Sequence, residues 1–171
     1  HGIELITSDA HSGLKAAKKS VFPSVKWQRC QFHLQQNSQS HVPKRDMKQE
    51  VSSDIRAILH APNRDEAERF LQLTIKKYQE KSKGLAEWME NNIPESLTVM
   101  DFPEAHRRRL RTSNLAERVN KEVRRRTRVA CIFPNTESCL RLVTAVIMEI
   151  DEEWIEGQVY LNFENKTEWN G

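Results

Sequence analysis

Residues 3–30, IELITSDAHSGLKAAKKSVFPSVKWQRC, carry the clearest signal of the fold class. Residues 3–7 are rich in β-branched side chains and predict a strand that ends at Ser8-Asp9. A helix is expected from Ser12 to about Lys19, and residues 25–30 predict a second strand. A strand, a helix and a strand in this order indicate a fragment of an α/β layer.

The character of the chain changes to helices between about residues 37 and 103. Apolar side chains recur at helical spacing over residues 46–60, and Asn63 to Glu66 has the pattern of a capping box at the start of another helix. Gly84 is expected to break the pattern before a third, short helix, and Pro94 and Pro103 to bracket a loop-like stretch. These apolar stripes predict core packing, so the fold class is α+β, mainly α.

Two further helices are expected near the carboxyl end. The first runs from Ser113 to about Arg126, with one apolar seam formed by three side chains, Leu115, Val119 and Val123. Residues 127–134 are predicted to be irregular, and a long helix follows from Asn135 or Thr136. The tail after Gly157 is short and expected to be disordered at its end.

Composition limits the class of protein. The chain has 171 residues, 30% of them charged and 37% apolar, which suits one typical domain or two small ones. No apolar run is long enough to cross a membrane, and three cysteines are too few and too odd in number for a disulfide scaffold, which fits a reducing cytosol. The first ten residues show neither an initiator Met nor a signal-like pattern, so we expect a piece of a longer protein.

Positive charge is concentrated in one segment. Residues 107–129 contain ten basic side chains and two acidic ones, whereas the whole chain has a net charge of only +3. The ten are Arg107, Arg108, Arg109, Arg111, Arg118, Lys121, Arg124, Arg125, Arg126 and Arg128. Such a strip predicts a polyanionic partner, and the alternative is a solvated, arginine-rich helix face.

Two carboxylates lie where chemistry is commonly found, and each has a structural alternative. Asp9 follows a strand and precedes a helix, so it either caps that helix or holds a metal ion at the end of the sheet. Glu117 lies at the head of the basic helix, where it either closes a capping box with Asn114 or holds a metal ion. In the second case the neighbouring arginines would favour its charged form.

Cys30 and His33 have the C-x-x-H spacing of half a zinc site. A structural zinc site needs four ligands, and Cys131 and Cys139 are eight residues apart, which is not a usual partner spacing. A cysteine nucleophile with His33 as its base is disfavoured, because strand residues three apart do not readily meet.

In combination these segments resemble a known family. The segments ITSDAHSGLKAAKKSVFP, WQRCQFHLQQN, RTSNLAERVNKEVRRRTRV and LVTAVIMEIDEEWIEGQVYLNFEN occur in this order and together are similar to the mutator-type transposases of bacterial insertion sequences, the IS256-like family. The resemblance covers nearly the whole chain. It implies an RNase H-like catalytic core with a DDE triad, interrupted by a helical insertion. The implied parts are a partial core over residues 1–36, an all-α insertion over 37–104, and the carboxyl-terminal core over 105–171.

The same resemblance implies roles for individual residues. Asp9 matches the second Asp of the triad in its D-A-H-x-G-L setting, and Glu117 matches the Glu in an N-x-x-E-R setting that includes Asn114. Cys30 and His33 match a C-x-x-H motif close to the active site. The first Asp lies on an earlier strand that these 171 residues do not contain, so we expect little cleavage by this chain alone.

The implied activity is DNA transposition by metal-dependent cleavage and strand transfer. Asp9 and Glu117 would hold Mg²⁺ or Mn²⁺ in a two-metal site, because carboxylates are the ligands such ions prefer. The implied partners are duplex DNA, as transposon ends and target, and further copies of the chain in a homo-oligomer; the implied location is the cytoplasm, on the nucleoid. Two alternatives are a catalytically inactive remnant that binds DNA as a regulator and a helical interaction module without a DNA role.

Overall fold

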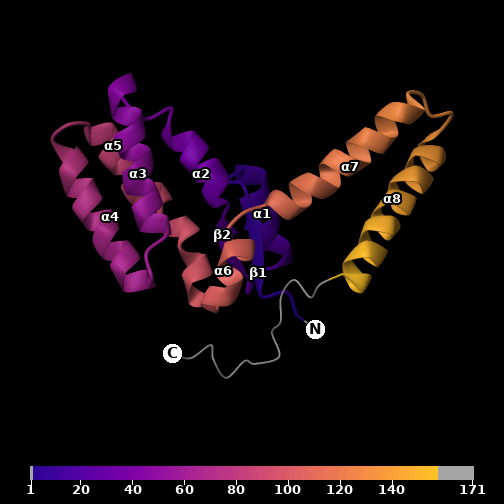
Figure 1. Ribbon diagram of the computed structural model, residues 1–171, viewed down its shortest axis with the longest axis horizontal. Helices are drawn as coiled ribbons and strands as arrows, with labels where there is room; N and C mark the ends of the chain where they lie inside the picture. Colours follow the sequence, from indigo (N-terminus) through magenta and orange to yellow (C-terminus); the bar gives the residue numbers. More distant parts are fainter. Residues whose placement is uncertain (1, 158–171) are drawn as a thin grey trace. The chain divides into compact units, whose positions relative to one another are not determined.

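The computed structural model describes residues 2–157 and divides into two compact units (Figure 1). One unit ends at Ser113 and the other begins at Asn114. Each is described by itself. No helix within the described range is long and apolar enough to span a lipid bilayer.

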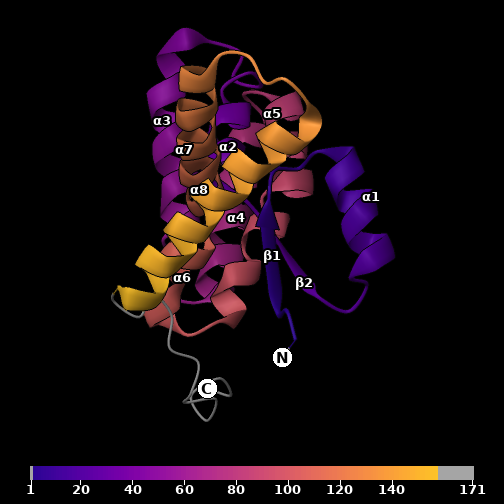
Figure 2. The same ribbon diagram turned by 90° about the vertical axis from the view of Figure 1, so that its right-hand side faces the viewer.

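The first unit begins with the predicted strand, helix and strand. These are β1 (Leu5–Ser8), α1 (Ser12–Val21) and β2 (Lys26–Arg29). The strands are parallel, with Leu5 opposite Lys26 and Ser8 opposite Arg29. Figure 2 shows α1 on one side of the two strands and the helices α2 to α4 on the other.

A helix follows β2, although residues 31–38 have no apolar stripe that would indicate one. It is α2 (Gln31–Ser38), and it places Cys30 at its amino-terminal cap and His33 in its first turn. The prediction that Cys30 and His33 are neighbours on a strand is therefore wrong. A side chain at the start of a helix and one three residues later face the same way.

The remaining helices of the first unit build its hydrophobic core. They are α3 (Lys48–Leu59), which follows the short 3₁₀ turn η1 (Arg45–Met47), α4 (Arg64–Gln79) and α5 (Lys83–Asn92). α4 packs against both α3 and α5, and the fully buried side chains include Ile55, Tyr78 and Leu85. The predicted Asn63 cap is confirmed, because its side chain accepts a hydrogen bond from the Glu66 amide. Gly84 lies inside α5 and does not break the pattern.

The stretch between Pro94 and Pro103, predicted to be loop-like, consists largely of two 3₁₀ turns. These are η2 (Pro94–Ser96) and η3 (Thr98–Asp101), and both lie against β2. The short helix α6 (Glu104–Leu110) follows, and it was not predicted from the sequence. Seven residues offer too few apolar positions for a periodic signal.

The second unit is a helical hairpin of α7 (Asn114–Ala130) and α8 (Thr136–Glu156). α7 continues four residues beyond the predicted end, so only residues 131–135 lie between the helices. The predicted start of α8 is confirmed, because the Asn135 side chain accepts a hydrogen bond from the Ser138 amide. Among the described residues of this unit Val146 alone is buried. Cys131, between the helices, has a left-handed backbone with a φ of 55°.

The predicted class, α+β and mainly α, agrees with this arrangement of one small parallel sheet and many helices. The RNase H-like core and the three-part division stay predictions. The expected disorder of the tail falls on residues 158–171, outside the described residues.

Candidate active site and basic helices

Asp9 lies directly after β1, at the carboxyl end of the parallel pair. Its side chain is half exposed, and its Oδ1 atom lies 3.7 Å from Nδ1 of His33. Asp9 is not the cap of α1, because His11 occupies the cap position and its Nδ1 atom accepts from the Gly13 amide at 3.1 Å. The capping alternative for Asp9 is therefore wrong, which leaves its carboxylate available at the end of the sheet.

A buried arginine, Arg29, lies on β2 beside the end of the strand that leads to Asp9. Arg29 is the partner of Ser8 in the sheet, and only 4% of its surface is exposed. It donates to Oδ1 of Asn92 at 2.5 Å and lies 3.6 Å from Oε2 of Glu95. Burial lowers the pKa of Arg29, whereas the charges of Glu95 and Asp9 raise it. The net result is a lowered pKa for Arg29, because the charges of Glu95 and Asp9 only partly oppose the effect of burial.

Neither Arg29 nor His11 was predicted from the sequence as part of this site. A signal for Arg29 was present, since a charged side chain on the inward face of a short strand must find polar partners. A signal for His11 was also present, because a polar residue just before a predicted helix is a cap candidate.

The Cys30 thiol is fully buried and its sulfur accepts two hydrogen bonds from Ser113. The Ser113 amide and hydroxyl both donate to it at 3.4 Å. Cys131 and Cys139, the other cysteines, are exposed and partly exposed, respectively. Within residues 2–157 no three His, Cys, Asp or Glu side chains come together as a set of metal ligands.

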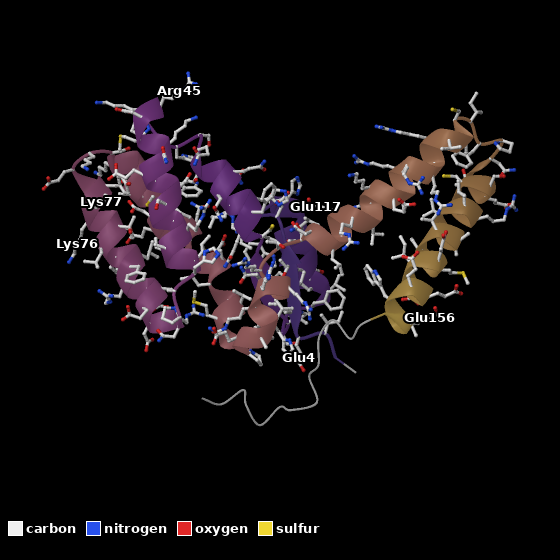
Figure 3. All side chains as sticks on the ribbon, viewed as in Figure 1. Glu4, Arg45, Lys76, Lys77, Glu117 and Glu156 are labelled. Atoms are coloured by element: carbon white, nitrogen blue, oxygen red, sulfur yellow. The ribbon has the colours of Figure 1, made fainter. Side chains whose placement is uncertain are left out.

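Glu117 is exposed in the first turn of α7, as Figure 3 shows. Because α7 begins at Asn114, that residue lies inside the helix and does not precede it as the predicted cap would. A carboxylate in the first turn interacts favourably with the helix dipole. Asp9 and Glu117 belong to different units, so the convergence of their carboxylates stays a prediction.

The basic segment is divided between the two units, because Arg107 to Arg111 precede Ser113 and the other basic residues lie on α7. The Arg107 guanidinium donates to the carbonyl oxygens of Phe102, Met100 and Pro62 at 2.7–3.0 Å. It therefore joins η3 and α6 to the connection between α3 and α4. A DNA contact by Arg107 stays a prediction, beside this structural role.

On α7 some basic side chains are paired within the hairpin. Arg125 and Arg126 both donate to Glu122, and Arg126 also donates to Glu149 of α8. The hydrogen bonds from the two arginines lower the pKa of Glu122 to about 2.

The other basic side chains of α7 have no ion pair with any described residue. These are Arg118, Lys121, Arg124 and Arg128. All four line an open groove of about 1130 Å³ along α7 and α8, and Trp154 of α8 lines it as well.

Comparison with known proteins identifies the class, which is that of the transposases. The chain is 57% identical over 162 residues to the transposase for insertion sequence element IS406 of Burkholderia multivorans. It is 39% identical over 167 residues to the transposase for ISRM5 of Rhizobium meliloti, and 34% identical over 166 residues to the transposase for IS256 in transposon Tn4001 of Staphylococcus aureus. These matches cover 95–98% of this chain and 42% of each relative.

The family follows from a further match. The family model described as "Transposase, Mutator family" matches residues 1–157. The chain therefore belongs to the Mutator family of transposases, which confirms the resemblance drawn from its motifs. It spans about two fifths of the length of the curated relatives that it matches.

Proposed function

We propose that this chain is part of an enzyme that cuts DNA at the ends of an insertion sequence and joins them to target DNA. In this reaction water cleaves a phosphodiester bond and frees a 3′-hydroxyl group, which then attacks a phosphodiester of the target DNA. The family supports DNA as the substrate. The observation that carries the catalytic role is the place of Asp9, half exposed at the carboxyl end of β1, with the local capping role filled by His11.

The donor atoms fit a hard divalent cation. Asp9 and Glu117 offer carboxylate oxygens, the ligand type that Mg²⁺ and Mn²⁺ prefer. A bound pair of such ions would make the attacking oxygen reactive and stabilise the leaving oxygen. Asp9 and Glu117 would hold the ions, and His33, whose Nδ1 atom lies 3.7 Å from Oδ1 of Asp9, would orient the Asp9 carboxylate.

Metal binding can be tested on the chain itself with Mn²⁺, which broadens the NMR signals of nearby amides. We expect broadening of the amides around Asp9 and around Glu117, and a weaker effect in Asp9→Asn and in Glu117→Gln. Asp65→Asn is a matched control, because Asp65 is a first-turn carboxylate of α4 in the helical part of the chain. Broadening that is the same in all four proteins would contradict the proposal.

Cleavage is a separate test, because these 171 residues contain matches to two of the three catalytic carboxylates. With supercoiled DNA and Mg²⁺ or Mn²⁺ we expect little or no nicking by this chain alone. Strong nicking that disappears in Glu117→Gln would show that cleavage does not need a third carboxylate.

The basic residues of α7 would neutralise DNA phosphates, and further copies of the chain would bind the same DNA. Binding to duplex DNA should then weaken steeply with salt. A plot of the logarithm of the binding constant against the logarithm of the salt concentration should fall with a slope of about 0.9 for each phosphate contact. Arg124→Ala should lower that slope by roughly one contact. Arg126→Ala should change it less, because Arg126 is held by Glu122 and Glu149. Binding that does not respond to salt would refute this role.

A second candidate function is that of a catalytically inactive, DNA-binding regulator. The four basic side chains of α7 that have no ion pair with a described residue suit a DNA-binding regulator as well as they suit the enzyme. The two functions differ in the Mn²⁺ experiment, because a regulator that binds DNA through α7 needs no metal ion bound by Asp9 or by Glu117.

A further inference from the structure

Residues 110–113, which we call the anchored segment, are held by side chains and main chain from the beginning of the molecule. The Thr7 hydroxyl donates to the Leu110 carbonyl at 2.7 Å, and the Gln31 amide donates to the Arg111 carbonyl at 2.9 Å. The Ser113 amide and hydroxyl both donate to the Cys30 sulfur at 3.4 Å. All of these contacts lie within the first unit and join residues about 80 to 100 positions apart.

The Cys30 sulfur is a firm point of attachment. The amide of Cys30 donates to the Ser8 carbonyl at 2.8 Å, and its carbonyl accepts from the Leu34 amide at 3.0 Å. The residue is therefore fixed by β1 on one side and by α2 on the other. It is also fully buried, so the sulfur has no water to compete with Ser113.

The contacts connect the two segments of the chain that lead to the candidate carboxylates. Thr7 and Ser8 directly precede Asp9, and the anchored segment directly precedes α7, in which Glu117 is the fourth residue. A helix transmits a displacement of its first residue to its first turn, because its main chain is a hydrogen-bonded unit.

We infer that Cys30 and Thr7 are positioning residues for Glu117: they fix the chain that leads into α7 to the strand end that carries Asp9. The inference rests on the proposed function for its consequence, but the anchoring itself is independent of any catalysis. It gives the Cys30 side chain a role that needs neither a metal ion nor a reactive thiolate.

Hydrogen exchange tests the anchoring. The reporters are the amides of Gln31 and Ser113, which make two of the contacts. Removing one hydrogen bond typically costs about 1 kcal/mol, so Thr7→Val should speed exchange of both amides roughly fivefold, and Cys30→Ala should speed it by at least as much. Cys30→Ser, which keeps an acceptor atom, should restore part of the protection.

A matched control separates anchoring from general loosening. Thr74→Val removes a hydroxyl that donates to the Phe70 carbonyl within α4 at 2.8 Å, and it should leave the Gln31 and Ser113 amides unchanged. If Thr74→Val speeds these two amides as much as Thr7→Val does, or if Cys30→Ala leaves them unchanged, the anchoring is refuted.

The Mn²⁺ experiment tests positioning. In Cys30→Ala we expect the broadening around Asp9 to persist and that around Glu117 to fall at least threefold, with part of it recovered in Cys30→Ser. Faster exchange with unchanged broadening at Glu117 would overturn the positioning role while leaving the proposed function intact. Broadening around Glu117 that is as strong in Glu117→Gln as in the wild type would instead refute the proposed function and with it the positioning role. Hydrogen exchange would still test the anchoring in that case.

Discussion

Replacing Gln28 by Leu should destabilise the first unit strongly. Gln28 is fully buried on β2, and its amide nitrogen donates to the carbonyls of Ser96 and Arg29, each at 2.7 Å. Its amide oxygen accepts from the Val99 amide, also at 2.7 Å. One side chain thus makes three hydrogen bonds, of which two join the sheet to the 3₁₀ turns η2 and η3 and the third stays within β2.

The size of the effect follows from what the substitution leaves behind. Leucine has a similar volume and no polar atom, so Val99 loses the acceptor of a buried amide, while Ser96 keeps a hydrogen bond from Gln31 at 3.0 Å. An unsatisfied buried group costs about 1–3 kcal/mol, and the donor bonds add to this, so the free energy of unfolding should fall by about 3 kcal/mol. The melting temperature should fall by about 6–12 °C.

Urea unfolding followed by far-UV circular dichroism measures the change. The matched control is Gln31→Leu, which removes a single hydrogen bond from a side chain that is buried to nearly the same degree, and should cost only about 1 kcal/mol. The reasoning fails if Gln28→Leu unfolds within about 0.5 kcal/mol of the wild type, or if the control loses more.

Two further predictions concern the helical hairpin. The pKa of Glu122, about 2, lies below its ordinary value of 4.5, so its stabilising contribution is present above pH 4.5 and is lost as the pH falls toward 2. NMR titration should give a midpoint near 2, and a higher midpoint in Arg125→Ala. Replacing Cys131 by Gly removes the cost of a left-handed β-carbon and should raise the hairpin's stability by about 1 kcal/mol in urea unfolding, whereas Cys131→Ala should give no gain.

The sequence predicted those parts of the fold whose signals are local. The first strand, the first helix and the second strand, together with the caps Asn63 and Asn135, rest on residues a few positions apart, and the structure confirms them. The helix α2 escaped prediction because QFHLQQNS has no apolar stripe, and its burial depends on neighbours that fold onto it.

The candidate site, too, could be predicted only where its signals are local. The place of Asp9 after a strand and of Glu117 in a first turn could be inferred from neighbouring residues. The contact between Cys30 and Ser113 could not, because 83 residues separate them and no pattern in either segment points to the other. Long-range contacts of this kind are decided by packing, which single-sequence periodicity does not record.

The part of the chain that supplies the first unit's hydrophobic core also affects how the sequence of such a protein can change in evolution. Every side chain of the buried cluster comes from residues 34–100, and none comes from β1, α1 or the helical hairpin. Substitutions that repack this cluster can therefore compensate one another without involving the segments that carry Asp9 and Glu117. We expect this helical part to diverge, shorten or be exchanged among descendants more freely than its share of the chain would suggest, provided that the contacts of Gln28 and Arg29 are kept.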